Sequence, residues 1–167
     1  MAFYKRPKTE KSEFEESLLD ISRVTRVVAG GKRLSFRATV VIGNKSKHQV
    51  GVGVGKGKDV SQAIQKAGNK AKKGLITVFI VNETIPYEVE AKYKAAKVII
   101  KPAQKGRGVR AGGAVRIVLK LAGVPNANAK ILSHSSNAIN NARVAIIALS
   151  KLKGFVCEGE LKAKPEQ

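Results

Sequence analysis

A strand of alternating valine and glycine, followed at once by a helix, is the stretch that most constrains how this chain can fold. Residues 50–55 read Val-Gly-Val-Gly-Val-Gly. Alternation with a period of two places the valines on one face of a strand and the glycines on the other. A strand face without side chains is costly unless something large approaches the backbone closely. We therefore expect the glycine face to be covered at very short range.

A helix is predicted directly after this strand. The turn 56–58 is basic and flexible, Asp59 or Ser61 can cap the helix, and Gly74 can end it. The apolar residues recur at helical spacing and form one stripe: Val60, Ala63, Ile64, Ala67, Ala71 and Leu75.

Three lysines, Lys66, Lys70 and Lys73, recur on another face of this helix with no carboxylate between them. In a lone helix such a row is more often a solvated face. The alternative is that the ammonium groups lie along a phosphate backbone. A nucleotide-binding phosphate loop before the helix fits poorly, because the glycine-to-lysine spacing is a residue short and Gly57 stands where that motif requires Ser or Thr.

The charge of the chain favours the phosphate-backbone interpretation. It has 32 lysine and arginine residues against 12 carboxylates, a net charge of +20 at pH 7. A field of that sign selects polyanions, either nucleic acid or an anionic membrane surface. No carboxylate occurs between Asp20 and Asp59 or between Glu90 and Glu158. Aromatic residues make up only 5% and tryptophan is absent, so the composition indicates recognition of the backbone and shape of a folded nucleic acid rather than base stacking.

Composition and sequence also exclude several classes of protein. A hydrophobic content of 43% is sufficient for a packed core, so global disorder is not expected. No stretch approaches the length of a membrane span, and residues 1–11 lack the apolar run of a signal peptide. The single cysteine, Cys157, cannot form an internal disulfide and suits a reducing compartment. We expect a cytoplasmic protein with no membrane partner, no metal and no cofactor.

Two domains of an α+β fold are expected. Residues 13–76 read as three antiparallel strands followed by one helix, and residues 93–154 read as strand, helix, strand and helix. A strand and a proline-marked linker at 77–92 join them. Residues 1–12 are expected to form a flexible basic arm and residues 155–167 a short tail. Strands are predicted at 19–27, 34–43, 47–54, 76–81, 95–101 and 127–132, and further helices at 114–122 and from a cap at 135–137 to residue 153.

A glycine pair, Gly30-Gly31, predicts a hairpin turn between two strands. Five basic residues and no acid surround it: Arg23, Arg26, Lys32, Arg33 and Arg37. Either the turn is solvated and its glycines only supply a positive φ, or the hairpin is an extended binding finger, which is at least as well supported. We expect the hairpin to be mobile in the free protein, because it has few apolar residues to pack.

A second glycine-rich basic segment, residues 104–113, carries Lys105, Arg107 and Arg110. It ends at Gly112-Gly113, directly before the helix predicted at 114–122. The free N–H groups there could receive a phosphate, or the glycines only let the start of the helix pack tightly. The residues leave both interpretations open.

Several of these segments together resemble bacterial protein five of the small ribosomal subunit. The matching segments are Val27–Ala38, Val50–Lys73, Thr84–Pro86, Ala111–Leu119 and Leu121–Asn126. The resemblance covers residues 13–153 in one register. The chain departs from the family at Ser135–Asn140, where the family usually has Gly-Ser, one variable residue and Asn-Pro, and Ala138 stands in place of the proline.

This resemblance implies an N-terminal unit like a double-stranded-RNA-binding domain without its first helix. It also implies a C-terminal βαβα unit with a left-handed crossover, which the general right-handed rule would not predict. The implied function is that of a structural constituent of the small subunit, which binds ribosomal RNA at the junction of body and head and contributes to decoding accuracy. Residues 23–33 would reach ribosomal RNA near the head and neck. Residues 108–116 would face protein four of the subunit where the mRNA enters, and protein eight would be a further neighbour.

The charge pattern and the resemblance together give a set of candidate site residues. Those expected to contact ribosomal RNA are Arg23, Thr25, Arg26, Gly30, Gly31, Lys32, Arg33, Ser35, Arg37, Lys56, Lys58, Lys66, Lys70, Lys73, Lys105, Arg107, Arg110, Ser135, Ser136, Asn137 and Arg143. Those expected at a protein-partner interface are Gly108, Gly112, Gly113 and Arg116.

Two other functions have to be weighed. A free double-stranded-RNA-binding regulator or RNA chaperone would explain the lysine row equally well, but not why the second unit is as basic as the first. An RNA-processing enzyme is disfavoured, because His48 and His134 are the only histidines and neither lies near a carboxylate in sequence. The acid-free span leaves the second unit without a general base or a set of metal ligands. We therefore expect no enzymatic activity.

Overall fold

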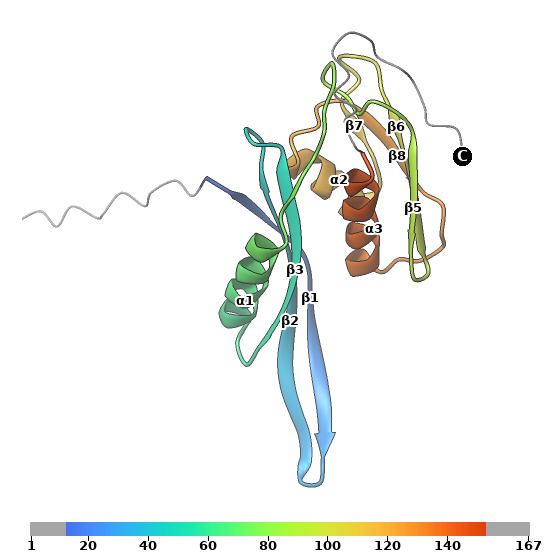
Figure 1. The fold of residues 1–167 in the computed structure, drawn as a ribbon. Coiled ribbons are helices and arrows are strands. Elements are labelled where there is room, and N and C mark those ends of the chain that lie inside the picture. The colour runs from blue at the N-terminus through green and yellow to red at the C-terminus, as the bar shows by residue number, and fades with distance from the viewer. Residues whose placement is uncertain (1–12, 153–167) are drawn as a thin grey trace, which may run out of the picture.

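The structure, a computed structural model, describes residues 13–152 and arranges them in alternating layers of helix and sheet (Figure 1). The predicted arm (1–12), the last predicted helical residue and the predicted tail (155–167) lie outside the described residues.

The first sheet has the order β1 (Glu15–Val28), β2 (Gly31–Asn44), β3 (Gln49–Gly57) and β4 (Ile76–Thr77). The second has the order β5 (Val89–Tyr93), β6 (Ala96–Pro102), β8 (Ala127–Ile131) and β7 (Val109–Arg110). Helix α1 (Val60–Lys73) covers the outer face of the first sheet, and α2 (Gly113–Leu121) and α3 (Ala138–Ser150) lie between the sheets. The predicted α+β fold of two units is confirmed.

The glycine face of β3 is covered by the backbone of α1. A Cβ added at Gly53 would overlap the carbonyl oxygen of Ala67, and Gly51 and Gly55 meet helix carbonyls one turn away in either direction. The alanines of the predicted stripe are fully buried at this contact. Only a strand without side chains allows a helix to approach so closely. The prediction of a cover at short range is confirmed, and the cover is the helix that follows the strand.

The valine face of β3 points into a core that both units share. Val50, on β3, and Val41, which pairs with Val52 from β2, are fully buried in one continuous cluster with residues of the second unit, among them Leu119 on α2 and Val98 on β6. Burial of this aliphatic surface is the main force that holds the units together. The first sheet is therefore packed on both faces.

The two units also approach each other backbone to backbone. A Cβ added at Gly43, at the end of β2, would overlap the carbonyl group of Leu121. One added at Gly123 would lie 2.9 Å from the carbonyl oxygen of Lys45, and Gly123 itself has a φ of +77°. These contacts fix the turn between β2 and β3 against the end of α2.

The predicted side-chain cap is present at the start of α3 but absent at the start of α1. The Asn137 side-chain oxygen accepts hydrogen bonds from the backbone N–H groups of Ile139 at 3.0 Å and Asn140 at 3.4 Å, so its predicted capping of α3 is confirmed. Asp59 occupies the N-cap position of α1, but its exposed side chain makes no capping hydrogen bond. Ser61 lies inside the helix. The prediction of a side-chain cap on α1 is therefore wrong.

The second unit contains two strands that were not predicted, although Val89, Ala91 and Tyr93 of the first alternate with charged residues as in a strand. β5 pairs antiparallel with β6 and lies at the end of the segment predicted as a linker. The two-residue β7 pairs in parallel with β8, and α2 connects them; the handedness of this crossover stays a prediction. The strand predicted at 76–81 is only the two-residue β4, because Asn82 and Glu83, with φ of +50° and +63°, turn the chain back.

Replacing Gly53 with alanine tests the close approach of α1. We expect Gly53→Ala to lower the free energy of unfolding by about 3 kcal/mol or more, since the added Cβ meets helix backbone that cannot move aside. The matched control is Gly30→Ala, because nothing lies within 4 Å of a Cβ at that position. Its free energy of unfolding should change by less than about 0.5 kcal/mol. Urea unfolding followed by circular dichroism measures both, and equal stability of the two variants would contradict the packing.

Candidate nucleic-acid interface

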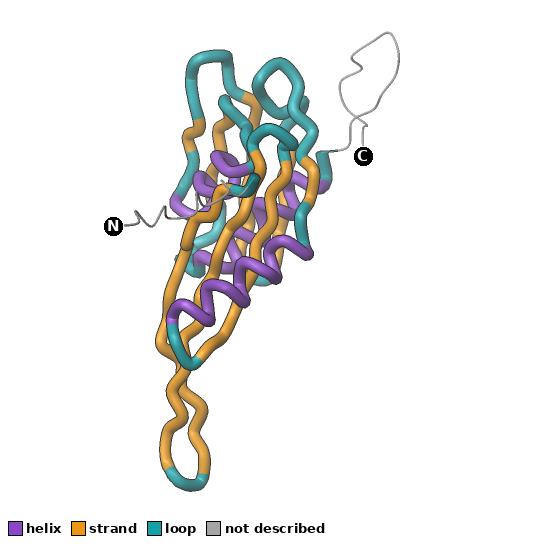
Figure 2. Tube along the Cα trace, turned by 90° about the vertical axis from the view of Figure 1, so that its left-hand side faces the viewer, coloured by secondary structure: helices purple, strands orange, loops and turns teal. Residues whose placement is uncertain are grey.

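The first two strands run far beyond the rest of their sheet. β3 ends at Gly57, opposite Phe36, so residues 24–35, which we call the finger, pair only with each other. The finger projects from the body of the molecule as a narrow two-stranded ribbon (Figures 1 and 2). The predicted hairpin is confirmed, and its shape suits an element that reaches into a partner.

The turn of the finger lies one residue earlier than the glycine pair indicated. Ala29-Gly30 is the turn, and Gly31 begins β2 with a φ of +130°, which glycine adopts far more readily than other residues. Arg26 is therefore paired directly with Arg33. A turn centred on the two glycines would instead set Arg26 opposite Ser35.

One face of the finger and its base carries a row of cations, which we call the guanidinium face: Arg26, Arg33, Arg37 and Lys56. Like charges directly opposite each other destabilise a strand pair, and an anion between them would remove that repulsion. Arg37 is held at the base of the finger: its Nη2 donates to the Ser22 hydroxyl at 3.2 Å, and that hydroxyl donates to the Asp20 carboxylate at 2.9 Å. The two arginines of the finger itself are exposed to solvent and available to phosphate.

Every ion pair in the described part of the chain uses a lysine. The pairs are Lys45–Glu15, Lys47–Glu13, Lys72–Glu16, Lys97–Glu90, Lys101–Glu88 and Lys105–Glu83. Within residues 13–152 no arginine forms an ion pair with a carboxylate. Guanidinium groups bind phosphate in planar, bidentate geometry, so the cations best suited to phosphate are the ones left without a carboxylate. Lys105 is the one predicted RNA-binding residue in an ion pair, and such an exposed pair is weak.

The lysine row of α1 lies on a different surface. Lys66, Lys70 and Lys73 are exposed along one flank of the helix and take part in none of these ion pairs. α1 covers the glycine face of β3, whereas Lys56 places the guanidinium face on the valine side of the same strand. The structure therefore does not bring the two sets of predicted residues together. Lys58 is exposed in the turn between β3 and α1.

A buried asparagine anchors the basic loop between β6 and α2. The Asn126 side chain accepts a hydrogen bond from the backbone N–H of Gly108 at 2.9 Å and donates one to the carbonyl of Glu83 at 3.3 Å. The backbone carbonyl of Asn126 accepts from the Thr84 hydroxyl at 2.8 Å. This network ties the loop to the linker between the units. Three predicted cations of the loop stay exposed: Lys105, Arg107 and Arg110.

Sequence reasoning missed both Asn126 and Thr84 as positioning residues. Asn126 directly follows Pro125, and Thr84 lies two residues before Pro86. Such residues often satisfy backbone groups in turns, and that is the signal that could have found them.

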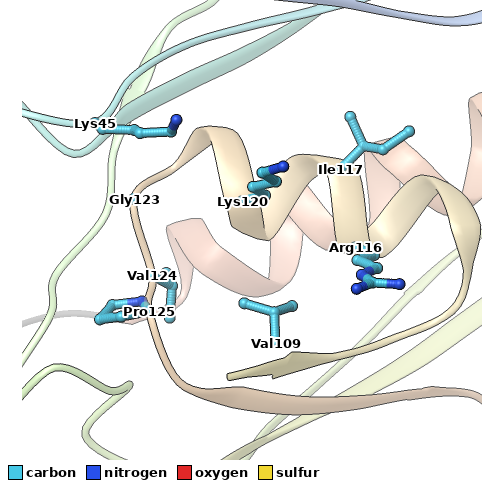
Figure 3. Close-up of a pocket in the computed structure, with 8 residues that line it drawn as sticks. All are labelled: Lys45, Val109, Arg116, Ile117, Lys120, Gly123, Val124 and Pro125. Carbon is cyan, nitrogen blue, oxygen red and sulfur yellow. The ribbon is translucent and has the colours of Figure 1, made fainter. Parts of the chain in front are cut away.

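A groove of about 600 Å³ lies beside α2 (Figure 3). Of the residues predicted at a protein-partner interface, Arg116 lines this groove, whereas Gly108, Gly112 and Gly113 do not. Arg116 and Lys120 extend from α2, and Lys45 reaches toward the helix from the turn between β2 and β3. The rest of the lining is Val109, Ile117, Gly123, Val124 and Pro125, none of which has a polar or charged side chain. No lining residue is acidic. The groove thus combines an apolar floor with a cationic rim, in which Arg116 and Lys120 have no carboxylate partner among residues 13–152 and Lys45 is paired with Glu15.

The glycines before α2 have different environments. A Cβ on Gly112 would lie 3.0 Å from Cδ1 of Ile131, so close packing explains this glycine, whereas nothing lies within 4 Å of a Cβ on Gly113. No side chain caps the first N–H groups of the helix. Gly108 has a φ of +71°, as the loop requires.

Three of the four candidates around α3 have roles inside the protein. Asn137 caps the helix, and the Ser135 carbonyl accepts a hydrogen bond from Asn141 Nδ2 at 3.0 Å. Arg143 donates to the Tyr93 hydroxyl at 3.0 Å. Ser136 is exposed. Contact of these residues with RNA stays a prediction.

Neither a metal cluster nor a helix able to span a membrane occurs among the residues that the structure describes. No three histidine, cysteine, aspartate or glutamate residues of 13–152 gather into a possible metal site, and none of the helices there is both long and apolar enough to cross a bilayer. The buried Nδ1 of His48 has no hydrogen-bond partner, and His134 is exposed.

Removing the Asn126 side chain should loosen the basic loop. Asn126→Ala leaves buried backbone groups unpaired, and we expect it to lower the free energy of unfolding by about 1–3 kcal/mol. Trypsin should cleave faster at residues 105–110. The control is Asn140→Ala, because the Asn140 side chain makes no hydrogen bond to any part of the chain that the structure describes. In this variant the free energy of unfolding and the rate of tryptic cleavage should stay near those of the unaltered protein. Equal cleavage rates in the two variants would show that Asn126 does not anchor the loop.

The finger should exchange its amide protons quickly in the isolated protein. Its cross-strand bonds are exposed on both faces and no second layer covers them, so local opening needs little free energy. Hydrogen–deuterium exchange followed by mass spectrometry measures residues 30–33 against 50–55 of β3 in the same sample. Strong protection of residues 30–33 would contradict the expected mobility.

Comparison with known proteins identifies the family. The family model for Ribosomal protein S5, N-terminal domain, matches residues 14–79, and that for Ribosomal protein S5, C-terminal domain, matches residues 91–163. The chain is 50% identical over 149 residues to small ribosomal subunit protein uS5c of Rhodomonas salina, covering 89% of this chain and 88% of that relative. It is 51% identical over 150 residues to small ribosomal subunit protein uS5 of Nostoc punctiforme, covering 89% and 85%. With uS5c of Spinacia oleracea it is 52% identical over 143 residues, which are 85% of this chain and 46% of the spinach protein. The chain belongs to the ribosomal protein S5 family of the small ribosomal subunit.

Proposed function

We propose that this chain clamps ribosomal RNA at the junction of body and head of the small subunit, and thereby contributes to translational accuracy and to the path of the entering mRNA. Membership of its family makes it a structural, non-enzymatic component of the small ribosomal subunit. The observation that carries the finer proposal is the way in which the acidic and basic side chains are paired. Glutamates pair only with lysines in the described part, and its arginines have no carboxylate partner.

The proposed mechanism is electrostatic clamping from several directions. The finger, the basic loop between β6 and α2, and the lysine row of α1 present separate cationic surfaces. Each can neutralise phosphates of a different RNA segment and release its counterions. Because the shared core fixes these surfaces relative to one another, the bound segments would be held in one arrangement. We propose as RNA contacts the residues that the sequence indicated.

We also propose that protein four of the small subunit docks at the groove beside α2, close to the entering mRNA, with protein eight as a further neighbour. The groove supports this proposal because an apolar floor with a cationic rim suits a protein segment that carries both apolar and acidic side chains. Residues 13–76 and 93–154 are proposed as the two domains, joined by 77–92.

A free double-stranded-RNA-binding regulator is the second candidate, and the exposed lysine row of α1 is the observation that favours it. Such a protein would bind any RNA duplex with similar affinity and would not associate with ribosomes. The rest of the cationic surface lies away from α1, which favours the ribosomal role.

The salt dependence of RNA binding tests the role of the finger. Each phosphate contact contributes about 0.7–0.9 to the slope of log affinity against log salt concentration. Changing Arg26, Lys32 and Arg33 to alanine should therefore lower the slope for small-subunit RNA by about two to three units.

The matched control changes three lysines that already have glutamate partners: Lys47, Lys97 and Lys101. It removes the same charge from the protein but should change the slope much less. An unchanged slope in the finger variant would show that the finger is solvated and binds no phosphate.

A further inference from the structure

The face of the finger opposite to the guanidinium face carries two exposed aliphatic side chains beside its cations. Val27 and Leu34 project from it, and we call these two residues with Thr25 the apolar ridge. The strand register places Thr25 directly opposite Leu34, and Val27 opposite Lys32. Val27 is 74% exposed and Leu34 is 42% exposed. Arg23 and Lys32 lie on the same face, so the ridge is bordered by cations at both ends.

The fold of the described residues does not use this ridge. The apolar side chains of β2 that pack under α1, such as Val40 and Ile42, lie at the other end of the strand. No helix or second sheet covers the finger (Figure 2). Single exposed aliphatic side chains are ordinary. Here Val27 and Leu34 lie diagonally across one face of a narrow projecting ribbon, whereas Val28, 41% exposed, lies on the other face opposite Gly31.

We propose that the apolar ridge packs against the ribose and base surface of ribosomal RNA while the guanidinium face holds phosphates on its other side. The finger would thus be wedged between two RNA segments rather than laid along one. This inference rests on the proposed function, and it adds a second mode of contact at the same site.

The charge around the ridge favours RNA over an apolar protein surface as its partner. The finger contains no acidic residue, and Arg23 and Lys32 would have to be brought against any partner that covers Val27. The wide, shallow minor groove of A-form RNA exposes ribose and base edges with phosphates on both sides. Aliphatic side chains insert as wedges into the minor groove of DNA in other nucleic-acid complexes. The ridge, with an aliphatic centre and a cation at each end, has that same arrangement.

The two faces should differ in how they respond to salt. Phosphate contacts release counterions, and removing them lowers the salt slope. Apolar contacts release none, so removing them lowers affinity equally at every salt concentration. The salt dependence therefore separates the ridge from the guanidinium face.

The test uses the full chain with Val27→Thr and Leu34→Thr together, and a transcript of the whole small-subunit ribosomal RNA as the probe. Threonine is well tolerated in strands; it replaces one methyl group of Val27 with a hydroxyl and removes the branched end of Leu34. We expect affinity to fall about tenfold or more, with an unchanged salt slope. The matched control is Val28→Thr, one position along and on the guanidinium face, which should change affinity by less than about threefold.

Each of the other possible outcomes would refute one part of the proposal. Unchanged affinity of the double variant, with a reduced slope in the arginine and lysine variant of the finger, would refute the ridge and leave the proposed function standing. Unchanged binding in both variants would refute the proposed role of the finger as well. Normal RNA binding by the double variant with loss of its association with the small subunit would assign the ridge to a protein. An equal loss in Val28→Thr would remove the distinction between the faces.

Discussion

The contact between α1 and the bare face of β3 is the one on which the rest of the structure depends. Because the glycines let the helix backbone lie directly on the strand, α1 needs only small alanine side chains there. Its lysines are consequently left on an exposed flank. The valine face of the same strand is then free to pack on α2 and α3, so one nine-residue strand joins both units. Gly43 and Gly123 likewise allow two backbones to lie in direct contact where the two units meet.

The shared core of the two units fixes the cationic surfaces relative to one another. The carboxylates of the described part are concentrated near β1 and the linker, where lysines neutralise them. The arginines of the described part lie on the finger and its base, on the basic loop, on α2 and, in the case of Arg143, on α3. Arg26 and Arg33 face each other directly across the finger, an arrangement that is unfavourable without an anion. The chain is thus built so that its charge is balanced by a polyanion rather than by itself.

Much of this could be predicted from the sequence, because the relevant signals are local. The Val-Gly alternation predicted a close cover, the glycine pair predicted the hairpin, and Asn137 predicted the cap of α3. What failed had several causes. The short strand β5 was hidden in a proline-marked linker, and the anchoring of the basic loop by Asn126 joins residues far apart in the chain. The direct pairing of Arg26 with Arg33 depended on a turn placed one residue earlier than the glycines indicated. The placement of α1 and the guanidinium face on opposite sides of the first sheet required the sheet itself.

The central claim is that the arginines without carboxylate partners fix this chain to the RNA of the small subunit. The most direct measurement is sedimentation of a native cell extract, first at moderate and then at high salt, with this protein followed across the gradient. We predict that it migrates with the small subunit and remains there at high salt, because several phosphate-binding surfaces and the protein contacts act together. Release into the free fraction at modest salt would contradict this account and would instead indicate a loosely bound RNA-binding regulator.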